Sequence, residues 1–292
     1  MEAYTEFAQV YDTFMDETPY EEWASFLVEL IEKYGITKPS KVQELSKEDC
    51  QKQGATVQQS CGEVTSREAT LASERNLVLD LGCGTGSLTE LMAAKGYDMI
   101  GVDISQEMLG IALSKREEAG SGTLYLCQDM RELELYSTVG TVISACDSVN
   151  YLLEEEELEE TFRLVNNYLY PGGIFIFDFN TLYKYEQVIG DTTIAENRDE
   201  CSFIWENYYY DKEHINEYDL TIFVRESEDE EVFRRFSETH YQRGYTLEEM
   251  TKLVKKAGLE FIAALDADSH ESPTKTSERI YIIAKEKGKE KM

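Results

Sequence analysis

The sequence predicts an α/β fold built on a largely parallel sheet, and three observations support this. The first is an apolar run that leads into a glycine-rich loop, Val78-Leu79-Asp80-Leu81-Gly82-Cys83-Gly84-Thr85-Gly86. The second is the alternation of strand-like and helix-like segments from residue 76 onward. The third is an acidic residue at the end of each of the first three strands, namely Asp80, Asp103 and Asp129. In an open parallel sheet these strand ends share one edge, and ligands bind at that edge.

Residues 1–35 are predicted to form an N-terminal leader and a helix. The helix begins near Pro19, which suits a first turn, and Gly35 can end it. Its apolar side chains recur at helical spacing, at Trp23, Phe26, Leu27, Leu30, Ile31 and Tyr34. Residues 36–75 are polar and carry few large apolar side chains, so we predict a polar insertion or linker there.

Residues 76–180 are predicted to form the first part of the core. Apolar runs predict five strands, at residues 77–81, 99–102, 123–127, 141–145 and 174–177. Helices are expected between them, at residues 87–95, at residues 105–118, and along the apolar face of Leu158, Phe162, Val165 and Leu169. Pro171-Gly172-Gly173 is predicted to form a turn before the fifth strand.

Residues 181–242 interrupt this alternation with β-rich, aromatic segments at residues 201–210, 219–225 and 232–241. In the middle segment Leu220, Ile222 and Val224 alternate with polar side chains, which predicts an antiparallel sheet with one buried face. A helix that begins at the capping pair Thr246 and Glu249 follows, and then two strands at residues 259–265 and 279–284. We therefore assign residues 243–286 to the same core as residues 76–180.

The composition limits the partners and the compartment. The chain of 292 residues has 28 Lys and Arg against 58 Asp and Glu, a formal charge of −30, which repels nucleic acid and anionic membranes. No apolar run approaches the length of a membrane span, and the N-terminus lacks the features of a signal peptide. The six cysteines and three histidines show no metal-ligand spacing. We therefore expect a cytoplasmic protein with reduced thiols and no metal.

The glycine loop narrows the ligand. Glycine lacks a Cβ atom, so it permits a sharp bend and a close approach of backbone to a ligand. The spacing here is G-x-G-x-G, and residue 87 is Ser, whereas the dinucleotide fingerprint is G-x-G-x-x-G. The loop therefore favours a ligand without a pyrophosphate over NAD.

These motifs resemble the class I S-adenosylmethionine-dependent methyltransferases. The resemblance covers residues 76–180 and the closing strands, and it implies a Rossmann-like seven-stranded sheet with helices on both faces and an inserted antiparallel β segment. The leader, with Tyr4, Phe7, Tyr11 and Asp12 followed by Tyr20 and Trp23, is similar to that of bacterial small-molecule methyltransferases. That subgroup includes sugar-amine N-methyltransferases.

The resemblance also implies how S-adenosylmethionine would bind. The glycine loop would approach its methionine portion, Asp80 would interact with the ammonium group, and Asp103 would accept hydrogen bonds from the ribose hydroxyls. Ile104 and Met108 would flank the adenine, whose amino group would donate to Asp129. The full set of expected cofactor-binding residues is Asp80, Gly82, Cys83, Gly84, Thr85, Gly86, Asp103, Ile104, Met108, Gln128, Asp129, Met130, Cys146 and Trp23.

The expected acceptor is a small molecule that receives the methyl group on nitrogen or oxygen. An amine needs only to be neutral, whereas a hydroxyl needs a base, and His240 or Asp147 could serve. His240 could equally be a hydrogen-bonded structural residue. Tyr11 is the third candidate catalytic residue, since leader aromatics in the resembling family close over the sulfonium. The insertion at residues 181–242 and the leader would form the acceptor side.

Two alternatives remain at this point. One is a non-catalytic sensor or assembly protein that binds the same cofactor. The other is an NAD-linked oxidoreductase, which the glycine spacing and the β insertion disfavour. The sequence carries no signal for an oligomeric state.

Overall fold

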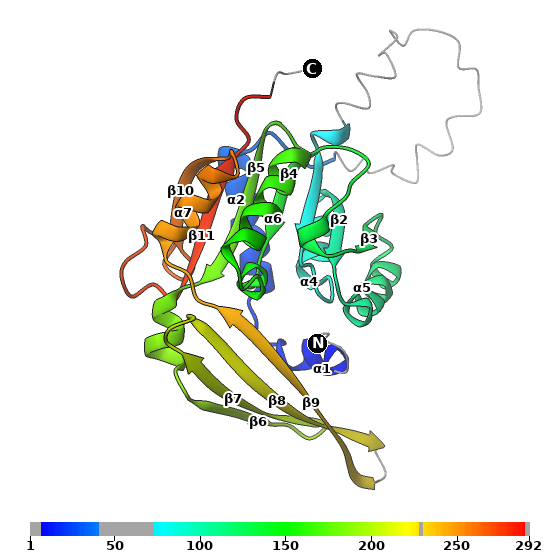
Figure 1. Cartoon of the computed structure of the whole chain (residues 1–292). Helices are drawn as coiled ribbons and strands as arrows, with labels where there is room; N and C mark the ends of the chain where they lie inside the picture. Colours follow the sequence, from blue (N-terminus) through cyan, green and yellow to red (C-terminus); the bar gives the residue numbers. More distant parts are fainter. Residues whose placement is uncertain (1–6, 41–72, 228–229, 290–292) are drawn as a thin grey trace, which may run out of the picture.

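The computed structural model describes residues 7–40, 73–227 and 230–289. Figure 1 shows two sheets, a large one flanked by helices and a smaller one below it, with the short helix α1 (Ala8–Phe14) lying between them. No helix in these described ranges is long and apolar enough to cross a membrane.

The large sheet has seven strands in the order β10-β11-β5-β4-β1-β2-β3. Strands β1 to β5 run parallel, and β11 is antiparallel to both β5 and β10. Their bounds are β1 (Leu77–Leu81), β2 (Asp98–Asp103), β3 (Leu124–Cys127), β4 (Val139–Ser144), β5 (Leu169–Asn180), β10 (Glu260–Asp266) and β11 (Arg279–Lys285). The order reverses between β1 and β4, the kind of position at which open α/β sheets bind ligands. The predicted seven-stranded α/β fold is confirmed.

One strand differs from the prediction. β5 begins at Leu169, so Pro171-Gly172-Gly173 lies inside the strand rather than in a turn before it. Its pairing with β4 shifts register there, from Leu169 opposite Val139 to Ile174 opposite Thr141. An irregularity in the ladder tolerates a proline, which has no N–H to donate.

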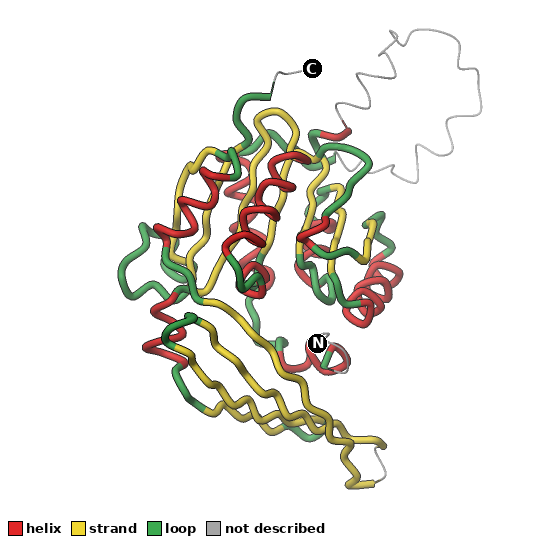
Figure 2. The backbone as a smooth tube through the Cα atoms, in the orientation of Figure 1, coloured by secondary structure: helices red, strands yellow, loops and turns green. Residues whose placement is uncertain are grey.

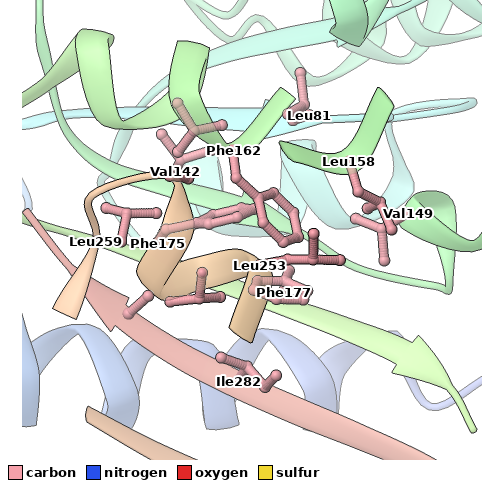
Figure 3. Packing of buried hydrophobic residues seen from close by; sticks show 14 of the residues in the cluster. Leu81, Val142, Val149, Leu158, Phe162, Phe175, Phe177, Leu253, Leu259 and Ile282 are labelled. Atoms are coloured by element: carbon pink, nitrogen blue, oxygen red, sulfur yellow. The ribbon is translucent and has the colours of Figure 1, made fainter. Parts of the chain in front are cut away.

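Helices cover both faces of this sheet. α2 (Tyr20–Tyr34), α4 (Ser87–Ala94) and α5 (Gln106–Ala119) lie on one side, and α6 (Glu155–Tyr168) and α7 (Leu247–Lys256) lie on the other. Because side chains alternate along a strand, Ile174 and Ile176 of β5 face α2, and Phe175 and Phe177 face α6. Figure 3 shows the hydrophobic cluster between the sheet and α6, in which the ring centroids of Phe162 and Phe177 lie 4.9 Å apart.

The insertion forms a separate antiparallel sheet in the order β6-β7-β8-β9. Its elements are η3 (Lys184–Ile189), β6 (Thr193–Asn197), β7 (Cys201–Tyr210), β8 (Ile215–Ser227) and β9 (Glu230–Arg243). β6 escapes the sequence pattern because four of its five residues are exposed, so no apolar alternation marks it. The buried face of β7 and β8 packs on Val10 and Phe14 of the leader.

The polar stretch at residues 36–75 has ends that belong to the core. Thr37 is fully buried, and its Oγ1 lies 2.7 Å from Oγ1 of Thr141 on β4. The Ser40 N–H donates to the Gly96 carbonyl at 2.7 Å. The insertion or linker predicted at residues 36–75 is therefore limited to residues 41–72, which lie outside the described residues.

Candidate active site

A cavity of about 520 Å³ opens at the carboxyl ends of β1, β2 and β4, where the strand order reverses. Most of the predicted site residues line it. They are Tyr11, Trp23, Asp80, Gly82, Cys83, Gly84, Thr85, Asp103, Ile104, Met108, Gln128, Asp129, Met130 and Cys146. Three predicted residues, Gly86, Asp147 and His240, lie outside the lining.

Two glycines of the loop, Gly84 and Gly86, are needed for different reasons. Gly84 has a φ of +54°, and a Cβ atom on it would meet nothing within 4 Å, so its backbone borders open space. Gly86 has a φ of +75°, but a Cβ there would lie 2.5 Å from the Tyr125 hydroxyl and 2.9 Å from Ala112. Gly84 thus permits a ligand to approach, whereas Gly86 permits the loop to pack against α5 and β3.

Asp103 connects the glycine loop to the end of β2. One carboxylate oxygen accepts the Gly84 N–H at 2.8 Å, and the other accepts the Ser105 N–H at 2.9 Å. Burial raises the pKa of this carboxyl. The side chain lines the cavity, and a carboxylate has capacity for further hydrogen bonds, so it can also accept from ribose hydroxyls.

Asp80 lies deeper, and its 2% exposure makes it a buried acid. The Thr89 hydroxyl donates to it at 2.6 Å, yet burial raises its pKa to about 7. An uncompensated carboxylate is costly at this depth, and a ligand ammonium group would offset that cost. The loop and the two acids therefore fit S-adenosylmethionine.

A salt bridge lies just after the end of β3. Arg131, in the short helix η1 (Met130–Glu132), contacts the Asp129 carboxylate at 2.6 Å, and it lowers the pKa of that carboxyl. The side-chain amide of Gln128 donates to the Glu134 carbonyl and accepts the Glu134 N–H. Ile104 is 61% exposed at the rim, an apolar surface available to a flat ring.

The end of β4 has an unusual backbone. Cys146 and Asp147 are consecutive residues with φ of +62° and +51°. Both of their N–H groups donate to the fully buried Asp178 carboxylate, at 3.0 and 2.6 Å. Arg279, whose guanidinium lies 4.4 Å from the Trp23 ring centroid, is 3.8 Å from that carboxylate. Asp178 and Arg279 hold this turn, and sequence reasoning missed both because they lie on distant strands.

This turn decides where two predicted residues point. The Cys146 thiol faces the cavity 3.9 Å from the Tyr11 hydroxyl, and burial raises its pKa to about 12, so it stays protonated at neutral pH. The Asp147 carboxylate points to the inserted sheet, where it accepts the Gln242 amide at 2.6 Å. Burial also raises the pKa of Asp147. Asp147 is therefore not placed to act as a base in the cavity.

The leader helix α1 closes the cavity by contacts at both ends. Asp12 accepts the Thr85 hydroxyl at 2.7 Å and pairs with Lys115 of α5 at 2.6 Å. The Phe7 N–H donates to Glu238 of β9 at 3.0 Å. In Figure 2 this helix, beside the N label, lies between the strands of the two sheets. The leader therefore joins the cofactor end of the cavity to the inserted sheet.

His240 lies behind the cavity wall and is only 2% exposed. The residue that lines the cavity at this point is Tyr151, whose hydroxyl lies 3.3 Å from the His240 Nδ1. Tyr151 ends the short helix η2 (Ser148–Tyr151), an element too short to leave a periodic pattern in the sequence. Among the described residues, no group of three or more His, Cys, Asp or Glu side chains could hold a metal ion.

Comparisons with known proteins indicate the family. Residues 78–173 match the family model of a methyltransferase domain. A methyltransferase-family protein of Geobacillus sp. (strain WCH70) is 33% identical over 97% of this chain and 99% of its own length. The crystal structure of an S-adenosylmethionine-dependent methyltransferase from Clostridium acetobutylicum covers 98% of this chain and 100% of that one, with 29% identity and a TM-score of 0.76.

A third relative matches only in part. The dTDP-3-amino-3,4,6-trideoxy-alpha-D-glucopyranose N,N-dimethyltransferase of Streptomyces venezuelae is 32% identical over 105 residues, which are 36% of this chain and 43% of that enzyme.

Proposed function

Since the chain belongs to the class I S-adenosylmethionine-dependent methyltransferases, with S-adenosylmethionine as its cofactor, we propose that it methylates a nitrogen or oxygen atom of a small molecule. One observation carries this proposal. One cavity is lined both by the glycine loop with two buried acids and by the aromatic side chains of Tyr11, Tyr20, Trp23 and Tyr151.

The bound cofactor supplies a methyl group on a positively charged sulfur, which is a good leaving group. The protein's own task is therefore to position two reactants and to exclude water. Asp80 and Asp103 orient the cofactor through its ammonium group and its ribose. Tyr11 and Trp23 also line the cavity, where aromatic side chains would favour the positively charged sulfonium. α1 covers the cavity between the glycine loop and β9.

The acceptor class follows from the walls and the charge. The acceptor end consists of phenols, an indole and a protonated thiol, which suits a compact uncharged or cationic molecule. A formal charge of −30 opposes a nucleic acid substrate. The partial relative from Streptomyces acts on an amino sugar, and this favours an amine acceptor here. We assign the acceptor side to the leader and residues 181–242, and the cofactor side to residues 76–180.

The test separates the small-molecule proposal from its rivals. The protein is incubated with methyl-labelled S-adenosylmethionine and a cell extract, which is then divided into a low-molecular-mass filtrate and retained macromolecules. We expect the label in a compound of the filtrate, and none with heat-inactivated protein. Label in the macromolecules would overturn the small-molecule acceptor. Tight cofactor binding without any transfer would favour the non-catalytic sensor.

A further inference from the structure

We propose that Tyr151, His240 and Glu238 form a proton relay that receives the proton of the acceptor's reacting N–H or O–H group. This inference rests on the proposed function, because it concerns the acceptor end of the same cavity. Tyr151 is the catalytic residue, since it lines the cavity, and His240 and Glu238 act through it.

The three side chains follow one another away from the cavity. The Tyr151 hydroxyl lies 3.3 Å from the His240 Nδ1, and the His240 Nε2 lies 3.3 Å from the Glu238 carboxylate. The His240 and Glu238 side chains are 1% and 7% exposed, so water has little access to the far part of the path. A tyrosine, a histidine and a buried carboxylate in this order resemble the arrangement by which carboxylates orient catalytic histidines.

A second tyrosine fixes the geometry. The Tyr218 hydroxyl lies 2.5 Å from that of Tyr151, and the Tyr218 ring stacks on the imidazole with centroids 5.0 Å apart and planes 6° from parallel. Tyr218 can donate to Tyr151, which then donates to Nδ1, so that Nε2 carries the ring hydrogen; Nε2 lies 3.3 Å from the Glu238 carboxylate, an ion-pair distance without hydrogen-bond alignment. The titratable groups that face His240 include Tyr151 of η2, Tyr218 of β8 and Glu238 of β9.

The proton transfer balances without any other reagent. A neutral amine bonds the methyl carbon with its lone pair, the carbon–sulfur bond breaks with its electrons going to sulfur, and the resulting ammonium then loses an N–H proton to the Tyr151 oxygen. A hydroxyl instead loses its O–H proton to the Tyr151 oxygen as its own oxygen bonds the methyl carbon and the carbon–sulfur bond breaks. In both cases the Tyr151 proton passes to Nδ1 of His240. The resulting imidazolium is stabilised by the Glu238 carboxylate.

The leader couples this relay to closure of the cavity. The Phe7 N–H donates to one oxygen of Glu238 at 3.0 Å, while the other oxygen faces His240. The carboxylate is therefore oriented by the same segment whose Asp12 binds the glycine loop. Relay geometry and closure of the cofactor end depend on one helix.

The experiment compares Tyr151→Phe with Tyr208→Phe, which removes an exposed hydroxyl on the face of β7 opposite the one that packs on the leader and outside the cavity lining. The acceptor is the filtrate compound labelled in the test above, and the cofactor is saturating. We expect Tyr151→Phe to lower the transfer rate about 100-fold and to leave S-adenosylhomocysteine affinity within about twofold. Tyr208→Phe leaves both unchanged. A Tyr151→Phe variant that binds cofactor and transfers at the wild-type rate overturns the relay alone, and a wild type that transfers nothing to the filtrate overturns the proposed function with it.

Two further readouts separate a relay from a structural role. Glu238→Gln lowers the transfer rate and leaves S-adenosylhomocysteine affinity unchanged, because the imidazolium formed during transfer loses its carboxylate partner. In nitrogen NMR of the protein alone, the His240 Nδ1 resonance shifts in Tyr151→Phe and stays in place in Tyr208→Phe. A wild-type transfer rate in Glu238→Gln together with an unshifted Nδ1 resonance in Tyr151→Phe overturns the relay, even if Tyr151→Phe folds poorly.

Discussion

The two ends of the cavity are built in different ways. The cofactor end takes its residues from one stretch of chain, between Asp80 and Met130, and places them at consecutive strand ends. The proposed acceptor end takes Tyr11 from the leader and Tyr151 from η2, which line the cavity, and His240 from β9, which lies behind Tyr151. Neighbouring strands can therefore build a cofactor site locally, whereas the acceptor site depends on how separate segments dock.

The electrostatics of the two ends also differ. The cofactor end has two buried acids whose pKa values are raised by burial, which suits a cationic ligand. The acceptor end has phenols, a thiol and an imidazole, which are groups that exchange protons or remain neutral. A change at one end should thus affect binding, and a change at the other should affect transfer.

The largest effect expected from a single change at the cofactor end is that of Asp103→Ala. It removes the acceptor for the ribose and for the Gly84 and Ser105 N–H groups, and should cost about 1–3 kcal/mol of binding. Calorimetry with S-adenosylhomocysteine measures this, with Asp98→Ala at the exposed start of β2 as the matched control. Unchanged affinity in folded Asp103→Ala would contradict the ribose assignment.

The next effect is a pH dependence of binding. In the protein without bound ligand, Asp80 has a pKa of about 7, so its carboxyl is protonated below that value. The cationic ammonium group of the ligand favours the ionised carboxylate. Binding then releases a proton, and affinity for S-adenosylmethionine rises about tenfold from pH 6 to pH 8. Asp80→Asn still accepts from Thr89 but cannot ionise, so its affinity should be nearly flat over this range. An equal slope in both proteins would place the titrating group elsewhere.

A smaller effect at the acceptor end sharpens the comparison. Tyr11→Phe keeps the edge-to-face contact with Phe7, whose centroid lies 5.6 Å away, and removes only the hydroxyl near Cys146. We expect transfer to fall about fivefold, which corresponds to about 1 kcal/mol, while cofactor affinity changes less than about twofold. Measuring both quantities on one preparation tests this. Equal losses in rate and affinity would move Tyr11 to the cofactor end.

The smallest effect should come from residues 41–72. Replacing them with a short Gly/Ser linker, while keeping Thr37 and Ser40 in place, should leave cofactor affinity within about threefold, because closure entropy changes slowly with loop length. Replacing all of 36–75 should instead destabilise the fold, since it removes the buried Thr37 contact with Thr141. A large loss of affinity in the first variant, with the fold intact by circular dichroism, would assign that segment to the site.

Local signals explain what was predictable in the site. Asp103 follows an apolar run, and its position at a strand end follows from that run alone. Tyr151 and Glu238 carry no such signal, because each is identified only by the distant side chain that it contacts. Asp178 follows an apolar run as Asp103 does, but its role in holding the turn after β4 is visible only in its contacts. His240 was a candidate on residue type, but its place behind Tyr151 follows from the register of β8 and β9.

By itself the sequence determined most of the strands, the glycine loop and the acidic strand ends, because each depends on a few neighbouring residues and on the fixed rule that parallel strands end at one edge. Only the tertiary structure decided which glycine borders the cavity, where the Asp147 carboxylate points, and that the leader joins both ends. Those outcomes are set by contacts between segments far apart in the sequence, in one case more than 200 residues, between Phe7 and Glu238. Such contacts form only when the two sheets and the leader have packed together.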